Sequence, residues 1–276
     1  MGRFRKVVRG ITPKPLRSAI WETYYGLKRE WNRNYEPVLN WHIGSEHWQS
    51  VFRFSALKRK RDNERCFIIG NGPSLKDMDL TPLREEVTFG LNRIYMLFPK
   101  LGFQTTYYVA VNPLVIEQCA HEIEALPMPK FISWYTRDMI RFTQNTIFVR
   151  DFLDGTLGFG KNPAFRLWEG GTVTYVAMQI AFYLGYREVI LIGVDHSFRV
   201  SGEPHSVVLA KGADQDHFDP NYFGDGFRWQ LPDLEMSERA YKLAKSAFER
   251  DGRRILDATV GGKLEVLPKV DFKSLF

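Results

Sequence analysis

The sequence predicts an α/β protein with a largely parallel, doubly wound sheet. Two observations predict this class. Short apolar runs rich in β-branched residues alternate with helical patterns from residue 65 to residue 257. A glycine-rich loop also follows the first of these runs, where α/β proteins place their ligands. The chain has 276 residues, 44% of them hydrophobic, so it can bury a full core. We expect one large domain, or one domain with an appendage.

The appendage is predicted at residues 1–62 and the α/β domain at residues 63–276. Residues 1–60 contain thirteen Lys or Arg and four Glu, which gives this stretch a net charge of +9. Residues 15–31 have apolar and aromatic side chains at helical spacing, with basic residues around them. Two interpretations stay open for this helical extension. It packs on the main domain with a solvated basic face, or it contacts an anionic membrane surface through residues 1–60.

The composition excludes several classes of protein. The whole chain has a net charge of +6, so residues 61–276 carry −3, and we expect no nucleic acid as a partner of the main domain. Cys66 and Cys119 cannot form a disulfide framework, which favours a reducing compartment. No apolar run reaches the ~18 residues of a membrane span, and the N-terminus lacks the apolar middle of a signal peptide. We therefore expect a cytoplasmic protein, peripheral at the inner membrane if the basic helix binds lipid.

The first strand of the α/β domain is predicted at residues 66–69 and leads into Gly70-Asn71-Gly72-Pro73-Ser74. Gly70 and Gly72 let the backbone turn sharply and approach another molecule closely, and Pro73 fixes the start of a helix near Ser74. The free N–H groups at such a helix start can bind an anion. A plain structural turn has a similar sequence and is the alternative.

Six further strands are predicted, at residues 87–91, 106–111, 130–134, 146–149, 188–194 and 254–256. Polar residues follow four strands, namely Asn71, Asn92, Asn112 and Asp195. Because parallel strands share one carboxyl edge, these side chains should converge on one crevice. A single Asn after a strand is an ordinary turn former. Three amides and an acid at one edge instead offer donors and acceptors for a base and a ribose, so a nucleotide is the expected ligand.

Residues 197–232 form a long segment rich in Gly, His, Asp and aromatic residues, which is typical of a lid over a site. His217 is the candidate general base, since a neutral imidazole can take a proton from an acceptor hydroxyl, and an ordinary surface His is the alternative. Tyr222 and Arg228 are further candidates for substrate contact. We expect His196 to lie in the crevice or to act as a cap, because its spacing from the other His and Cys residues matches no zinc pattern.

Four motifs occur in a fixed order: Gly70-Asn71-Gly72-Pro73-Ser74-Leu75, a strand followed by Asn92, the Asn112-Pro113 pair, and a strand that ends in Gly193-Val194-Asp195. In this order they resemble the bacterial CMP-sialic acid-dependent sialyltransferases. They also resemble the broader group similar to 6-hydroxymethylpterin diphosphokinase, which occurs in surface-polysaccharide and flagellar glycosylation settings. The resemblance covers about residues 65–260 and implies a Rossmann-like transferase fold.

The resemblance also implies that the glycine loop and the Asn positions hold CMP. Asn71, Gly72 and Ser74 would line the phosphate and ribose, while Asn92 and Asn112 would contact the nucleotide. A second helix start that faces the ligand in the family corresponds here to Gly170-Gly171-Thr172-Val173, although a plain cap is equally compatible with two glycines. The full candidate nucleotide site is Gly70, Asn71, Gly72, Pro73, Ser74, Asn92, Asn112, Pro113, Gly171, Thr172 and Asp195.

The two families differ over metal. The diphosphokinases carry an Asp-rich motif after the third strand that holds Mg²⁺ on the triphosphate, whereas this chain has Val111-Asn112-Pro113, with no carboxylate. CMP-sugar transfer needs no metal, because the leaving CMP carries one phosphate that hydrogen bonds can stabilise. We therefore expect no metal site and no cofactor, with Mg²⁺ required only under the alternative.

The lid departs from the sialyltransferase pattern. The family has a His-Tyr pair followed by a second His, whereas this chain has His217-Phe218 and places Asn221 at the second position. Tyr222 can supply the lost Tyr only if the loop runs differently. The leading hypothesis is an inverting, metal-independent glycosyltransferase that moves a CMP-activated, sialic acid-like sugar onto a surface-glycan acceptor. The alternatives are a nucleotide-dependent diphosphotransferase and a non-catalytic nucleotide-binding protein in glycan assembly.

Overall fold

The computed structural model describes residues 44–58, 64–152, 156–199 and 202–276. The chain divides into two compact units, Met1–His47 and Trp48–Phe276. The predicted helix at residues 15–31 and most of the predicted extension lie outside the described residues, so these stay predictions. The predicted boundary at residue 62 falls within the second unit, to which all the described strands belong.

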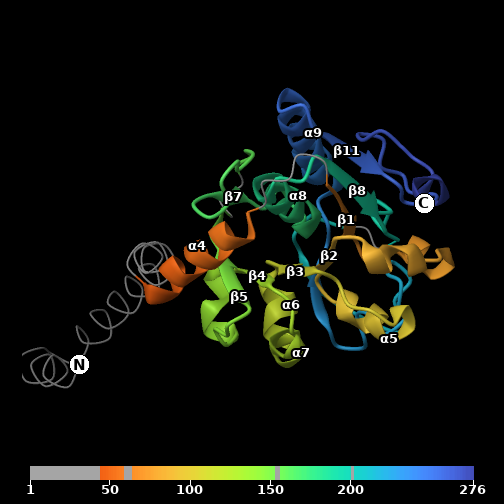
Figure 1. Cartoon of the computed structure of the whole chain (residues 1–276). Helices are drawn as coiled ribbons and strands as arrows, with labels where there is room; N and C mark the ends of the chain where they lie inside the picture. Colours follow the sequence, from red (N-terminus) through yellow and green to blue (C-terminus); the bar gives the residue numbers. More distant parts are fainter. Residues whose placement is uncertain (1–43, 59–63, 153–155, 200–201) are drawn as a thin grey trace, which may run out of the picture. The chain divides into compact units, whose positions relative to one another are not determined.

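Among the described residues, seven strands form one parallel sheet in the order β11-β8-β1-β2-β3-β4-β5 (Figure 1). Their bounds are Arg65–Ile69 (β1), Thr88–Leu91 (β2), Tyr107–Ala110 (β3), Lys130–Ser133 (β4), Thr146–Val149 (β5), Glu188–Ile192 (β8) and Arg254–Asp257 (β11). Each strand predicted from an apolar run occurs within two residues of its predicted ends. The Rossmann-like, doubly wound α/β fold is thereby confirmed.

The sheet is covered on both faces, which explains why its strands are continuous apolar runs. In β1, Cys66 and Ile68 belong to the same buried cluster as helix α8 (Val173–Leu184). The ring of Phe67 instead packs against Phe272 and Phe276 near the C-terminus, with centroids 6.5 and 5.8 Å apart. A strand buried on both sides cannot show the alternating pattern of a half-exposed one.

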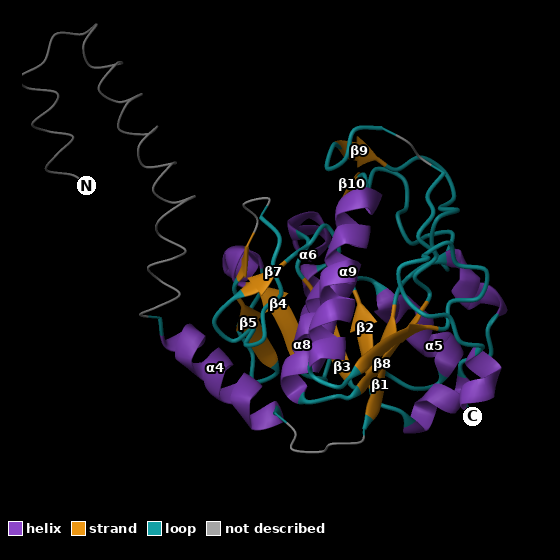
Figure 2. Cartoon of the chain, turned by 90° about the horizontal axis from the view of Figure 1, so that it is seen from above, coloured by secondary structure: helices purple, strands orange, loops and turns teal. Residues whose placement is uncertain are grey.

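Helices α8 and α9 (Leu234–Arg250) lie side by side on one face of the sheet (Figure 2). Eleven of the twelve α8 residues are buried, because the helix lies between the sheet and α9. Asp233 caps α9 by accepting the Met236 N–H at 2.8 Å, and Gly185 ends α8 in a left-handed conformation, with φ +98°.

The remaining helices are short, apart from α4. They are α4 (Ser45–Leu57), α5 (Phe98–Leu101), α6 (Pro113–Gln118) and α7 (Ala120–Ala125), with 3-10 helices at Pro73–Asp77, Thr81–Glu85, Ile94–Leu97, Trp134–Met139 and Phe272–Leu275. From Trp48 onward α4 packs on the domain. The Ser50 hydroxyl accepts the Phe148 N–H at 3.0 Å, and Phe54 contacts Phe131, with ring centroids 5.0 Å apart.

Two smaller pairs of strands lie outside the main sheet. β6 (Asp151–Phe152) pairs with β7 (Leu167–Trp168), and the antiparallel strands β9 (Val207–Leu209) and β10 (Arg228–Gln230) lie within the predicted lid, residues 197–232. The hairpin of β9 and β10 stands at one end of the molecule beyond the carboxyl edge of the sheet (Figure 2). No helix in the described part of the chain is both long and apolar enough to cross a membrane.

Candidate functional site

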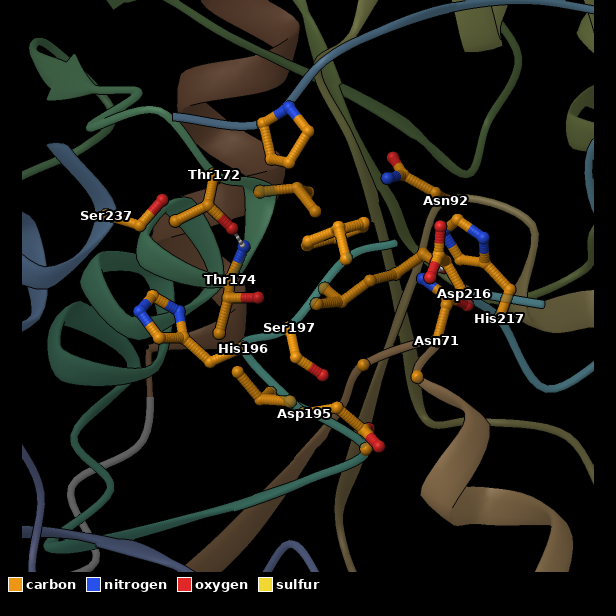
Figure 3. Close-up of a pocket in the computed structure, with 18 of the residues that line it drawn as sticks. Asn71, Asn92, Thr172, Thr174, Asp195, His196, Ser197, Asp216, His217 and Ser237 are labelled. Atoms are coloured by element: carbon orange, nitrogen blue, oxygen red, sulfur yellow. Dashed lines mark hydrogen bonds between the residues drawn. The ribbon is translucent and has the colours of Figure 1, made fainter. Parts of the chain in front are cut away.

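A polar cavity lies at the carboxyl edge of the sheet, where β1, β2 and β8 end (Figure 3). Strands on one side of β1 come from the first half of the domain, and β8 and β11 on the other side come from the second half. Open α/β sheets bind ligands where the strand order reverses in this way. The polar side chains around the cavity come from Asn71, Asn92, Thr172, Thr174, Asp195, His196, Ser197, Asp216, His217 and Ser237.

The loops after β1 and β8 pack directly against each other at the base of this cavity. The Gly72 N–H donates to the Gly193 carbonyl oxygen at 2.9 Å. Ser74 donates its N–H and its hydroxyl to the two carboxylate oxygens of Asp195, at 3.0 and 2.7 Å. A Cβ at Gly72 would lie 1.8 Å from Asp195 Oδ2, and one at Gly70 would lie 2.3 Å from the Gly193 oxygen. The two glycines are therefore required by contacts within the chain itself.

The donors of Ser74 are thus directed at Asp195, and neither Pro73 nor Ser74 lines the cavity. The helix predicted near Ser74 is a five-residue 3-10 helix that ends where Met78 becomes extended, so it offers little of the dipole on which the predicted anion site depends. Burial raises the pKa of the Asp195 carboxyl, and the hydrogen bonds from Ser74 reduce this rise without cancelling it.

Two amide oxygens in the cavity wall have no hydrogen-bond partner among the described residues. The side-chain N–H of Asn71 donates to the Leu91 carbonyl oxygen at 3.0 Å, which fixes the amide orientation and leaves Oδ1 buried and unpaired. Oδ1 of Asn92 is likewise buried and unpaired. Asn92 adopts a left-handed conformation, with φ +47°, which Asn tolerates better than most residues. Leaving a buried acceptor unpaired costs about 1–3 kcal/mol, so both oxygens are suited to accept from a ligand.

The N-terminus of α8 forms the opposite wall of the cavity (Figure 3). Gly170 and Gly171 precede it with φ values of +58° and +75°, conformations that favour glycine. The Thr172 hydroxyl caps the helix by accepting the Thr174 N–H at 3.3 Å. Thr172 is therefore the helix cap, and it also lines the cavity. The positive end of a twelve-residue helix points toward the cavity, where it favours an anion.

His196 lies beside this helix start. It has φ +54°, and its Nε2 is 3.2 Å from Glu238 Oε1 on α9. The His196 side chain is only 7% exposed. It lines the cavity and is held by a carboxylate, as expected of a crevice residue.

The lid is docked onto the carboxyl edge by several contacts. The Phe218 N–H donates to the Asn71 carbonyl oxygen at 2.9 Å. The Arg93 N–H donates to the Tyr222 hydroxyl at 3.3 Å, while the Arg93 guanidinium donates to the carbonyl oxygens of Tyr222 and Asn221. Tyr222 is buried, at 1% exposure. The Arg that follows the second strand thus holds the lid segment over the site.

Within the lid, Asp214 orients the imidazole of His217. Nδ1 of His217 is 2.9 Å from Asp214 Oδ2, and the imidazole stacks on the Tyr222 ring with centroids 4.0 Å apart and an interplanar angle of 7°. Asp214 also accepts the backbone N–H groups of Asp216, His217 and Phe223. Burial raises the pKa of Asp214, but the interaction with His217 and these N–H groups outweigh it, so the pKa is lowered overall. With Nδ1–H donated to a carboxylate, Nε2 is the nitrogen free to accept a proton.

The other predicted residues lie elsewhere. Asn112 caps α6 through Oδ1 and donates to Gln230 Oε1 at 3.3 Å, and Pro113 is the first residue of that helix. Arg228 pairs with Glu117 Oε2 on α6 at 2.9 Å and does not line the cavity. The predicted residues that the structure brings together around the cavity are Gly70, Asn71, Gly72, Asn92, Gly171, Thr172, Asp195, His196, His217 and Tyr222.

Three residues with a role in this geometry were not predicted: Asp214, Arg93 and Glu238. Asp214 stands three residues before His217, and this Asp-x-x-His spacing was the available signal. Arg93 follows Asn92 directly, but nothing in the sequence shows that it reaches the lid. Glu238 is 42 residues from His196. Within the described residues no group of three or more His, Cys, Asp or Glu side chains could hold a metal ion.

Comparison with known proteins gives a family and a fold. No curated protein matches the chain. A solved structure, that of the MAf glycosyltransferase from Magnetospirillum magneticum AMB-1, is similar with a TM-score of 0.51 and 16% identity, over 85% of this chain and 40% of that chain. This likeness shows the fold alone, and this chain corresponds to less than half of that protein. The family model described as 6-hydroxymethylpterin diphosphokinase MptE-like matches residues 45–201, more than half of the chain. The chain therefore belongs to the MptE-like family.

Proposed function

We propose that the chain is a glycosyltransferase that moves a CMP-activated acidic sugar onto a hydroxyl group of a glycan acceptor, with inversion and without a metal ion. One observation carries the proposal. The cavity combines two buried, unpaired amide oxygens with a histidine that a carboxylate orients, which suits nucleotide binding beside a general base.

The amide oxygens of Asn71 and Asn92 are acceptors, so the ligand must bring donors to them. A ribose diol and the exocyclic amine of cytosine are donors of this kind. Both oxygens are buried, so each new hydrogen bond would form away from water. A buried polar atom without a hydrogen bond there costs free energy. Neither oxygen would attract a phosphate, which also offers only acceptors.

The phosphate is expected at the start of α8 instead. The helix points its positive end at the cavity, and Thr172 and Thr174 bring hydroxyl groups there. The Ser74 donors are already engaged by Asp195. This assignment moves the phosphate from the predicted glycine loop to the second predicted helix start.

Nucleotide binding requires the lid to move. The cavity volume is about 170 Å³, whereas sites for small molecules and cofactors have volumes of roughly 300–1,000 Å³. The hydrogen bond between Phe218 and Asn71 closes the lid over the base of the cavity. Opening of this contact would admit the donor, and closure would then exclude water from the activated sugar.

In the proposed step, His217 Nε2 takes the proton of the acceptor hydroxyl. The acceptor oxygen forms a bond to the anomeric carbon of the donor sugar while the bond from that carbon to the phosphate oxygen of CMP breaks. CMP leaves with the electron pair, and one displacement inverts the anomeric centre. Asp214 would stabilise the imidazolium through Nδ1–H, as carboxylates do in other histidine-based sites.

A second candidate is the diphosphotransferase activity for which the family is named. Such a reaction on a nucleoside triphosphate usually needs carboxylates that hold Mg²⁺ beside the phosphates. The sequence after β3, Val111-Asn112-Pro113, contains none, and Asp195 is occupied by Ser74. The first candidate is therefore preferred.

Calorimetric titration with CMP, ATP and GTP, each with and without Mg²⁺, tests the proposal. Binding of CMP that is independent of Mg²⁺ is expected, and Asn71→Ala should weaken it by about ten- to a hundredfold. Arg228→Ala is the matched control, because this lid residue lies outside the cavity. Binding of ATP only with Mg²⁺, with no affinity for CMP, would favour the second candidate and contradict the first.

A further inference from the structure

A second cavity lies within the lid segment itself and shares three residues with the first. Its volume is about 370 Å³, within the roughly 300–1,000 Å³ range of small-molecule sites. Asp216, His217 and Phe223 line both cavities, so the imidazole forms part of the wall between them. The other wall residues are Arg199, residues 208–215 and Trp229.

We propose that this second cavity binds the acceptor as a pyranose sugar ring and presents one of its hydroxyl groups to His217. The inference rests on the proposed function, since it places the second substrate of the same reaction. It gives the acceptor substrate a binding site and a chemical class, neither of which the nucleotide cavity defines.

The walls of the second cavity have the mixed character that suits a sugar. Phe223 and Trp229 give an aromatic wall, with ring centroids 5.3 Å apart and an interplanar angle of 27°, and both are 9% exposed. A flat apolar surface can pack against the C–H face of a pyranose. Arg199 and Lys211 contribute cationic groups. The Arg199 guanidinium donates to the Gln215 side-chain oxygen, so the remaining N–H groups of Arg199, Lys211 and Gln215 offer donors to hydroxyl groups around the ring.

The position of His217 connects this cavity to the reaction. Its Nδ1 is held by Asp214, and one ring face is covered by Tyr222, so neither is available to a substrate. Nε2 has no hydrogen-bond partner among the described residues. A base that borders both cavities can accept a proton from a hydroxyl in one while the donor sugar occupies the other. The two cavities together therefore supply a site for each substrate of a single displacement.

A bulky side chain at Ala213 tests the assignment. Ala213 lines the second cavity, is exposed, and does not line the first cavity, so Ala213→Trp should fill the second cavity and leave the nucleotide site intact. Val207→Trp is the matched control, because Val207 is 56% exposed on the same hairpin and lines neither cavity. The probes are the methyl pyranosides of galactose, glucose and N-acetylglucosamine at millimolar concentration, observed by saturation-transfer NMR in the presence of CMP.

At least one pyranoside should bind the wild-type protein and the Val207→Trp variant. Its affinity for the Ala213→Trp variant should be at least about tenfold lower, while calorimetry gives the same CMP affinity for all three proteins. Equal pyranoside binding by the two variants, or no binding of any pyranoside by the wild type, would overturn the assignment. If the proposed function itself is wrong, the result is different: the wild-type protein does not bind CMP.

Discussion

Replacement of Gly72 by Ala tests the contact that joins the loops after β1 and β8. The backbone of Gly72 has φ −67° and ψ 160°, which Ala adopts without strain, so any effect must come from the added methyl group. That group would lie 1.8 Å from Oδ2 and 2.5 Å from Cγ of Asp195. The carboxylate must therefore move away from Ser74.

The cost arises from the two hydrogen bonds that Asp195 would lose. Ser74 donates to it at 3.0 and 2.7 Å, and hydrogen bonds to a charged group contribute about 1.5–3 kcal/mol each. Replacing Gly by Ala also restricts the unfolded chain, which returns about 0.4–1 kcal/mol. The expected net loss in the free energy of unfolding is about 2–5 kcal/mol, and for a domain of this size each kcal/mol lowers Tm by about 2–4 °C.

Chemical denaturation followed by circular dichroism measures this loss. Gly224→Ala is the control, since its added methyl group would meet nothing within 4 Å and its backbone is not left-handed. Asp195→Ala supplies a second test, because the cost of Gly72→Ala should shrink when the carboxylate is absent and only the contact of the added methyl group with the Gly193 oxygen, at 2.9 Å, remains. Equal stability of the Gly72→Ala and Gly224→Ala variants, or an unchanged cost in the Asp195→Ala background, would show that Asp195 does not require glycine at position 72.

Three further predictions concern the cavity and the buried carboxyls. Asn92→Gly should weaken CMP binding by about ten- to a hundredfold in calorimetry, and glycine tolerates the left-handed backbone at this position. Unchanged affinity would argue against a ligand role for the Asn92 amide. His217→Ala should lower turnover by about 10²–10⁴-fold with CMP affinity nearly unchanged, while Asp214→Asn should lower turnover less. Near-normal turnover of the His217→Ala variant would exclude the base role. Burial raises the pKa of the Asp151 carboxyl. Burial and the charge of Asp151 together raise the pKa of Glu169. The folded chain therefore retains protons on these two carboxyls that the unfolded chain releases above about pH 4. The free energy of unfolding should therefore fall as pH rises from about 4 toward the raised pKa values. Asp151→Asn should reduce this fall between about pH 4 and pH 8, measured by chemical denaturation at each pH. An unchanged pH dependence of the free energy of unfolding in this variant would contradict the raised pKa of Asp151.

The sheet and part of the site could be predicted because each depends on local patterns and on one topological rule. Apolar runs such as residues 66–69 mark strands buried on both faces, and parallel strands bring their carboxyl ends to one edge. That rule placed Asn71, Asn92 and Asp195 around one crevice, and all three line the cavity.

The remaining details depend on side-chain partners that are distant in sequence. Asp195 engages Ser74 from 121 residues away, so the sequence could not reveal that the glycine loop serves the chain's own carboxylate. Asn112 follows a strand in the same way as Asn92, yet its amide turns to cap α6. An Asn after a strand thus either lines the cavity, as Asn92 does, or caps a helix, as Asn112 does. Only the direction of the side chain distinguishes the two cases.

The proposed reaction breaks the bond between a sugar and CMP without a metal ion. Release of CMP from CMP-N-acetylneuraminic acid, followed by ³¹P NMR in the presence of EDTA, tests it most directly. CMP should accumulate with the wild-type protein, and accumulation should be about 10²–10⁴-fold slower with His217→Ala in the presence of a glycan acceptor. No release of CMP by the wild-type protein, together with Mg²⁺-dependent formation of AMP from ATP, would contradict the proposed reaction.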